Sequence, residues 1–434
     1  MNSPSQFNTS TEGSTEGSRS PRSSREGMPA EGDTQPCVVV VVSRPHRTLW
    51  LAVALALGLA LLAAQGVPRI PAEASEVLVR SNPTGGVRPP ARKPPAEVLR
   101  DPVAAAAEAR KWIEVGRSEL DTRALGRAQA LLQPWWFDVE PSPEIRLLRA
   151  TLRQSLHDFP SAITDLVAVV RVEPRNAQAW LLLSTLHTVR GNFSAAREAA
   201  LQLAPLTGHL TGTAAAASVA SVNGQLEDSY DLLKAALLKD RRAPVSIRLW
   251  SLTLLGEMAD RLGRGQDAEA HFKQALGLGL HDAYLLGAYA DHLLSSSKAA
   301  EAIPLLDPHL GPDSLLLRRA LAEQFVHPGS EKLKALKQTL SARFDASRAR
   351  GEALHQREEA RFALSLLGQP LRALELARLN WQIQREPADL KILVDAALAA
   401  GHAQTLAQVR EWLAASSLED HAIRRRLESD AAAR

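Results

Sequence analysis

The chain of 434 residues is poor in cysteine and in aromatic residues: it has a single cysteine, Cys37, and 4% Phe, Trp and Tyr. One cysteine excludes an intramolecular disulfide framework and a zinc site built from several cysteines. A β-rich fold would need more Val, Ile, Tyr and Trp than this chain has, whereas Ala and Leu run throughout it. The composition therefore favours helices packed through small and aliphatic side chains.

No charge of one sign dominates the chain either. It has 51 Lys and Arg against 48 Asp and Glu, for a net charge of +3. A dedicated nucleic-acid-binding protein is expected to concentrate basic residues on one face. We therefore expect no nucleic-acid partner.

The chain also lacks the short motifs that carry chemistry. It has no His-Glu-x-x-His and no Gly-x-Ser-x-Gly. Residues 263–268 match the dinucleotide-binding glycine pattern, but they follow a predicted helix, whereas that pattern has meaning only after a strand. Residues 352–355 form one Glu-x-x-His step, and a di-iron bundle needs two such steps and two further Glu residues. We predict no catalytic residue, no cofactor and no metal site, and hence no enzyme.

One long apolar run stands out in the first hundred residues. Residues 48–67 carry no charge and are about long enough to cross a hydrocarbon core as a helix. We expect a transmembrane helix there, after a disordered tail at 1–47 that is rich in Ser, Thr, Gly, Pro and Glu. A cleaved signal peptide and a buried helix are the alternatives. Arg44 and Arg47 lie close to the run and favour an N-terminus inside the cell.

A proline-rich stretch separates this run from the rest of the chain. Residues 68–100 hold seven prolines, which favours an extended, semi-rigid linker. From Asp101 and Pro102 the pattern becomes helical, since Asp is a good N-cap and Pro suits the first helical turn. We expect residues 101–434 to be one helical domain.

The stretch from Pro143 to Leu210 consists of two copies of one unit of 34 residues. Residues at the same place in the two copies are alike: Ala150 and Ser184, Phe159 and Phe193, Ala162 and Ala196, Leu166 and Ala200. Further copies follow at 211–248, 249–282, 283–311, 354–387 and 388–415, with an irregular hairpin around residues 327–330. A charged helix from Leu418 to Arg434 is expected to cap them.

A period of 34 with this aromatic, small-residue and proline pattern resembles the tetratricopeptide repeat. The resemblance implies an all-α fold: an α-solenoid of antiparallel helix hairpins, about eight of them here, with the C-terminal helix as cap. Small residues are expected where the two helices of a hairpin cross, and each hairpin must cover the apolar side of its neighbour.

In the resembled family, the first helix of each hairpin lines a groove that binds a protein partner. Carrying its positions two, five, nine and twelve onto this chain yields the candidate partner-binding residues Thr151, Gln178, Thr185, Thr188, Trp250, Glu257, Tyr284 and Asp291. Trp250 and Tyr284 are the candidate anchors, because aromatic residues concentrate interface energy. The alternative is that both pack between neighbouring hairpins.

Taken together, the pattern is similar to that of single-span bacterial proteins with repeats outside the cytoplasm. It implies a membrane-anchored scaffold or adaptor in the assembly, secretion or quality control of envelope proteins, held in the inner membrane by residues 48–67. Two alternatives stay open: a tether or regulator that faces the cytoplasm, and an accessory subunit of a secreted enzyme or polysaccharide system.

Overall fold

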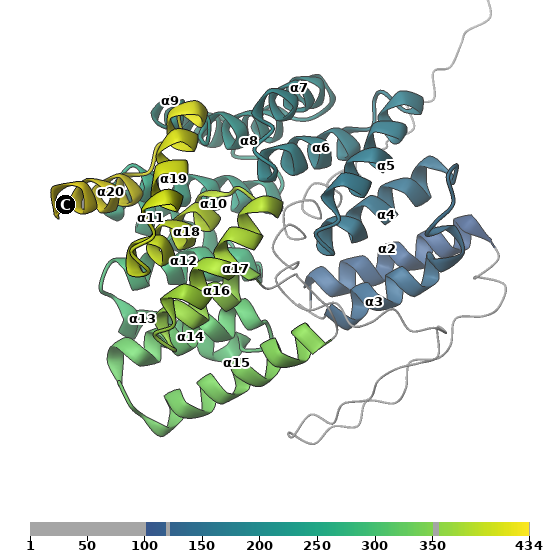
Figure 1. Cartoon of the computed structure of the whole chain (residues 1–434). Coiled ribbons are helices and arrows are strands. Elements are labelled where there is room, and N and C mark those ends of the chain that lie inside the picture. Colours follow the sequence, from purple (N-terminus) through teal and green to yellow (C-terminus); the bar gives the residue numbers. More distant parts are fainter. Residues whose placement is uncertain (1–100, 119–121, 350–355, 434) are drawn as a thin grey trace, which may run out of the picture. The chain divides into compact units, whose positions relative to one another are not determined.

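The computed structural model describes residues 101–118, 122–349 and 356–433. Within these ranges the chain is helical and contains no strand, as expected for an all-α fold (Figure 1). The predicted tail, apolar segment and linker, and the Glu-x-x-His step at 352–355, lie outside the described residues. None of the described helices is long and apolar enough to cross a membrane.

The described helices pair into nine antiparallel hairpins, and a single helix follows them. The pairs are α2 (Pro102–Ser118) with α3 (Thr122–Leu131), α4 (Pro143–Ser155) with α5 (Phe159–Val172), α6 (Ala177–Val189) with α7 (Phe193–Leu203), α8 (His209–Ala220) with α9 (Leu226–Lys239), α10 (Val245–Arg261) with α11 (Gly265–Leu276), α12 (Ala283–Ser295) with α13 (Ala299–Leu306), α14 (Asp313–Val326) with α15 (Glu331–Ala349), α16 (Gln356–Ser365) with α17 (Pro370–Ile383) and α18 (Pro387–Ala399) with α19 (Ala403–Ser416); α20 (His421–Ala433) is the last helix. Short 3-10 helices η1 (Gln133–Trp135), η2 (Ala204–Leu206) and η3 (Asp307–His309) lie in connections.

Left-handed residues end the first helix of most hairpins. Gly224 and Gly263 have φ of 78° and 77°, a conformation that glycine adopts without steric cost. Where the sequence has no glycine, His157 and Ser297 take the same conformation, with φ of 57° and 59°. Side chains cap the starts of several helices: Asn176, for example, precedes α6 and accepts a hydrogen bond from the backbone N–H of Ala179.

Small residues let the two helices of each hairpin approach. Ala162, Ala196 and Ala268 are fully buried at corresponding places in their repeats. In the hairpin of α10 and α11, Gly256 lies against the ring of Phe272, and a Cβ at residue 256 would be 2.6 Å from a ring carbon. The repeat pattern therefore places glycine where only a hydrogen atom fits.

A buried ion pair holds the second hairpin together, and its arginine also reaches the connection from the first. Arg149 and Asp165 are 3% and 2% exposed, and the guanidinium donates to both carboxylate oxygens, at 2.8 and 2.6 Å. Arg149 also donates to the backbone oxygens of Trp135, Trp136 and Asp138. One side chain thus ties α4 both to α5 and to the connection that leaves α3.

Gly256→Ala should destabilise the protein by about 1–3 kcal/mol, because the added methyl group must displace the buried ring of Phe272. Gly265→Ala is the matched control, since its Cβ would have no heavy atom nearer than 3.8 Å. It should be neutral or stabilising by up to about 1 kcal/mol. Urea unfolding of both variants measures the difference, and equal stabilities would show that α10 and α11 do not cross as described.

Asp165→Ala should cost about 3–5 kcal/mol of unfolding free energy, because it leaves the buried guanidinium of Arg149 without its carboxylate. Glu144→Ala removes an acid from the exposed pair that Glu144 makes with Arg110, whose side chains are 39% and 52% exposed. Its cost should be at most about 1 kcal/mol. Thermal or urea unfolding measures both variants. If Asp165→Ala lost no more unfolding free energy than Glu144→Ala, the pair of Arg149 and Asp165 would not be buried as described.

Candidate functional site

The C-terminal hairpins contact the turns of hairpins far earlier in the chain. The connection from α17 to α18 reaches α6, where the backbone N–H of Arg385 donates to the carbonyl of Val189 at 2.7 Å. The side chain of Arg385 lies over Gly191, at 3.2 Å from where a Cβ would be. Gln384 approaches Nδ1 of His157 at 3.4 Å.

The connection from α19 to α20 makes the same kind of contact with the next turn. The amide of Asn223 donates to the carbonyl of Ser416 at 2.7 Å, and the Glu419 carboxylate accepts the backbone N–H of Leu226 at 3.3 Å. Ser417 lies over Gly224, with its Cβ 2.9 Å from where a glycine Cβ would be. One turn further on, His421 lies over Gly263 in the same way, at 3.1 Å.

We call this set of contacts the return seam. On the early side it comprises His157, Val189, Gly191, Asn223, Gly224, Leu226 and Gly263, and on the late side Gln384, Arg385, Ser416, Ser417, Glu419 and His421.

Beside the return seam, α12 and α16 are joined by charge. The carboxylate of Asp291 on α12 receives Arg318 of α14 at 2.5 Å and Arg361 of α16 at 2.6 Å. Burial by itself raises the pKa of Asp291, but the two guanidinium groups outweigh it and hold that pKa well below its usual range. Asp291 is therefore ionised, and it links helices 70 residues apart in the sequence.

Glu257 on α10 is held in a different state. Its carboxyl group hydrogen-bonds to the hydroxyl of Tyr284 on α12. Burial raises the pKa of Glu257 to about 7; the bond from Tyr284 and the nearby Arg261 lower it, while Glu386 and Asp260 repel its negative charge. Glu257 is thus close to half-protonated at neutral pH, and one of the groups that keeps it so, Glu386, belongs to the C-terminal hairpins.

Glu386 and Asp389 begin α18 and share one arginine. Arg357 on α16 donates to both carboxylates at 3.3 Å, and the amide of Asn380 donates to Asp389 at 2.8 Å. Asp389 also accepts the backbone N–H of Glu386 at 2.9 Å. Burial, followed by mutual repulsion, raises the pKa of Glu386; burial also raises that of Asp389, against the attraction of Arg357.

The candidate groove residues fall into three groups: those among charges, those that are buried, and those on α6. Glu257, Tyr284 and Asp291 lie among the charges of α14, α16 and α18 just described, and Trp250 is 5% exposed with no hydrogen-bond partner for its Nε1. Thr151 is fully buried and donates to the carbonyl of Leu147.

The candidates on α6 are as accessible as Glu257, Tyr284 and Asp291, which are half-buried too. Gln178, Thr185 and Thr188 are half-buried, and the two threonine hydroxyl groups donate to carbonyls one turn earlier in their own helix. The structure therefore brings Asp291 into contact with Arg361 of the C-terminal hairpins and places Glu257 and Tyr284 near the charge of Glu386, whereas α6 meets those hairpins at its end, where Arg385 bonds Val189.

The repeat pattern did not point to the residues of α16 and α18 that meet the groove positions. Arg357, Arg361 and Glu386 occupy no position that the resemblance marks as special. One local signal was available: Glu386-Pro-Ala-Asp389 is a capping box at the start of a helix, with Asp389 bonding back to the N-cap backbone. It locates the start of α18, but says nothing of what α18 contacts.

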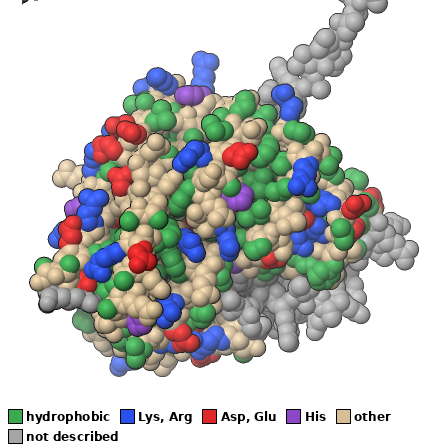
Figure 2. Space-filling model, turned by 45° about the horizontal axis from the view of Figure 1, so that its top comes forward, with side chains coloured by type: hydrophobic (Ala, Val, Ile, Leu, Met, Phe, Trp, Pro, Cys, Tyr) green, Lys and Arg blue, Asp and Glu red, His purple; other side chains and the backbone are tan. Residues whose placement is uncertain are grey.

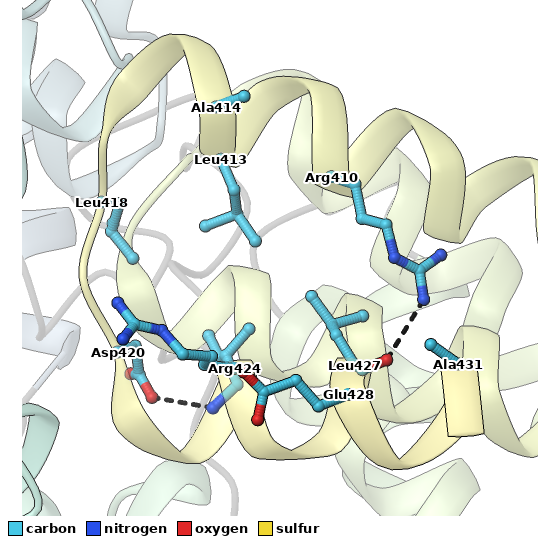
Figure 3. A pocket seen from close by; sticks show the side chains of 10 residues that line it. Arg410, Leu413, Ala414, Leu418, Asp420, Arg424, Leu427, Glu428 and Ala431 are labelled. Carbon is cyan, nitrogen blue, oxygen red and sulfur yellow. Dashed lines mark hydrogen bonds between the residues drawn. The ribbon is translucent and has the colours of Figure 1, made fainter. Parts of the chain in front are cut away.

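No group of three or more His, Cys, Asp or Glu side chains in the described ranges is arranged to hold a metal ion. A shallow pocket of about 440 Å³ lies between α19 and α20, lined by apolar side chains such as Leu413 and Leu427 and by Arg410, which donates to the backbone oxygen of Leu427 (Figure 3). One face of the molecule shows basic and acidic side chains interspersed, with no large area of one sign (Figure 2).

The sequence model of the tetratricopeptide repeat matches residues 147–208 and 253–314. These repeats are tetratricopeptide repeats. No curated protein matches the chain. The matched segments include α6, α12 and most of α4 and α10, so the candidate groove residues other than Trp250 lie within recognised tetratricopeptide repeats.

Solved structures with similar folds share little sequence with this chain. PilW, a type IV pilus biogenesis factor, is 15% identical, with 48% of this chain and 96% of PilW covered and a TM-score of 0.37. A Rap protein complexed with competence and sporulation factor is 13% identical over 75% of this chain and 89% of its own, with a TM-score of 0.46. Human IFIT1, a dimer with PPP-AAAA, is 12% identical over 73% and 83%, with a TM-score of 0.40. Likeness at this level carries no argument about the partner.

Glu257→Gln should change how stability depends on pH. The folded protein holds a proton on Glu257 up to about pH 7, whereas the unfolded chain releases it near 4.5, so this contribution to stability is present below about 4.5 and is lost as the pH rises through 7. The amide cannot ionise. The stability of Glu257→Gln relative to the wild type should therefore rise between pH 5 and pH 8, as measured by thermal unfolding.

Glu269→Gln is the matched control for this measurement. Hydrogen bonds from Lys273 and Lys298 lower the pKa of Glu269 to about 2, so Glu269 stays ionised in the folded and unfolded chain from pH 5 to pH 8. Its difference from the wild type should be flat over that range. A flat difference for Glu257→Gln as well would show that Glu257 holds no proton in the folded state.

Proposed function

We propose that this chain is a membrane-anchored scaffold whose tetratricopeptide repeats hold protein partners during the assembly, secretion or quality control of envelope proteins. The observation that carries the proposal is the run of recognised repeats, because tetratricopeptide repeats mediate protein–protein interaction.

The sequence supports the proposed anchor. Residues 48–67 are uncharged and about long enough to span a membrane, and the proline-rich residues 68–100 would hold the repeats away from the bilayer. Arg44 and Arg47 favour an N-terminus inside the cell, which would put the repeats outside the cytoplasm of a bacterium.

We propose α6 as the part of the groove that a partner reaches first. Gln178, Thr185 and Thr188 lie there at the positions that line the groove in the family, and all three are half-buried, as are Glu257, Tyr284 and Asp291. Their surroundings differ from those of Glu257, Tyr284 and Asp291, which are engaged with one another or with α14 and α16. A partner segment that binds on α6 would leave the ion pairs of Asp291 with Arg318 and Arg361 intact.

Thr185→Arg should lower the yield of a partner crosslinked to the full-length protein in its native membranes by about tenfold, equivalent to about 1.4 kcal/mol. The reason is that the long charged side chain obstructs α6. Thr164→Arg is the matched control: Thr164 is exposed on α5, the second helix of its hairpin, away from the groove positions.

The yield is measured by quantitative mass spectrometry of the purified adducts. An equal loss for both variants would contradict the placement of the partner on the first helices, and the absence of any reproducible partner in the wild type would contradict the scaffold. Recovery of cytoplasmic partners alone would contradict the proposed orientation.

A further inference from the structure

We propose that the C-terminal hairpins, residues 356–416, together with α20, are a releasable occupant of the face that α10 and α12 would otherwise offer to a partner. Binding of a partner along that face and closure of the return seam would then exclude each other. This inference rests on the proposed function in one respect, namely that the first helices of the repeats are where a protein partner binds.

The first argument is which residues are covered. Glu257, Tyr284 and Asp291 lie at positions that line the groove in tetratricopeptide repeats, and each meets a charge carried by the C-terminal hairpins. Asp291 pairs with Arg361, while Glu257 and Tyr284 face the charges of Glu386, and Tyr284 also that of Arg357. The chain's own C-terminal part thus pairs directly with Asp291 and places charges near Glu257 and Tyr284, where a partner would otherwise bind.

The second argument is that the contacts are polar and separate. They are single hydrogen bonds and ion pairs: Arg385 to Val189, Asn223 to Ser416, Leu226 to Glu419 and Arg361 to Asp291. Such bonds each contribute little net free energy because water replaces them on opening. Interfaces that open and close are of this kind, whereas permanent ones are more apolar.

The distribution of the apolar core agrees with this. One cluster of buried apolar residues extends from Leu147 to Ala322, and a separate one covers the C-terminal hairpins from Ala360 to Leu427. Apolar side chains that join the opposite cluster are few: Val222 and Phe193 pack with the C-terminal cluster, and Ile383 packs with the earlier one. A further cluster packs Phe362 of α16 and Leu366 just after it with α14 and α15, so the C-terminal hairpins are attached through apolar side chains to the hairpin just before them. Toward the hairpins from α4 to α13, in contrast, their core is largely separate.

The third argument is that closure confines like charges. Glu257 on α10 and Glu386 on α18 repel each other, and burial disfavours the ionised form of both. The other titratable groups that act on Glu257 are Tyr284, Arg261 and Asp260. The other charged groups that act on Glu386 are Asp389, Arg357 and Glu358. Opening would return both glutamates to water and so relieve their burial and mutual repulsion. These two effects destabilise the closed form.

The test compares the full-length wild type with a release variant that carries Asn223→Ala, Arg361→Ala and Glu419→Ala. These changes remove three side-chain contacts between the early and the late hairpins. The matched control variant carries Arg110→Ala, Lys298→Ala and Arg343→Ala, which remove three ion pairs elsewhere, with Glu144, Glu269 and Asp313. Both variants lose three polar side chains, so a general loss of stability affects both.

The measurement is native-state hydrogen exchange, read at the amide of Arg385, whose bond to the carbonyl of Val189 crosses the return seam and is removed by none of the substitutions, and at amides within α6 and α10. We expect the Arg385 amide to lose protection at least tenfold in the release variant, with α6 and α10 unchanged, and no selective loss in the control variant. An unchanged Arg385 amide, or one that loses protection only together with α6 and α10, would overturn the proposal.

Partner capture in native membranes then tests the competition. The release variant should yield several-fold more crosslinked partner than the wild type and the control variant. An equal or lower yield from an opened seam would overturn the competition while leaving the scaffold in place. Failure to capture a partner with any of the three proteins would contradict the scaffold itself, and the exchange result would still decide whether the C-terminal hairpins are released.

Discussion

Every hairpin of this chain has an apolar side that it cannot bury alone, and the rest of the structure depends on that constraint. Small residues such as Ala162, Ala196 and Gly256 bring the two helices of a hairpin close, which leaves the larger apolar side chains to meet the next hairpin. Contacts between neighbours therefore dominate: each first helix packs on the next first helix along the chain. Stacking of neighbouring hairpins does not depend on the polar groups at the turns, such as Asn223, and these groups can therefore make contacts with distant parts of the chain.

The repeat pattern predicts turns and helix ends well because these features depend on residues close together in the sequence. A left-handed residue ends α8 at Gly224 and α10 at Gly263, where the pattern places turns, and the buried alanines of successive repeats coincide. Helix ends, turns and the small residues at crossings all follow from residues less than one repeat apart. An all-α fold of stacked hairpins is therefore predictable from the sequence, and it is what the described residues form.

The return seam is beyond such prediction. Asn223 and Ser416 are 193 positions apart, and their contact depends on the accumulated rotation of several hairpins, which no single repeat encodes. The same holds for Asp291 and Arg361, 70 positions apart. The resemblance marks Glu257, Tyr284 and Asp291 as candidate groove residues, which stays a prediction. It offered no means of foreseeing that Arg357, Arg361 and Glu386 of the same chain would meet them.

The charges around Asp291 are compatible with the proposed competition between a partner and the C-terminal hairpins. Asp291 is ionised only because Arg318 and Arg361 outweigh its burial, and Arg318 belongs to the neighbouring repeat whereas Arg361 belongs to the C-terminal hairpins. Loss of Arg361 would therefore leave Asp291 with one guanidinium group and one carboxylate oxygen free to accept a donor. A partner that supplies an arginine or lysine at that place would restore the pairing that Arg361 provides in the closed form, so that the exchange of one for the other costs little electrostatic energy.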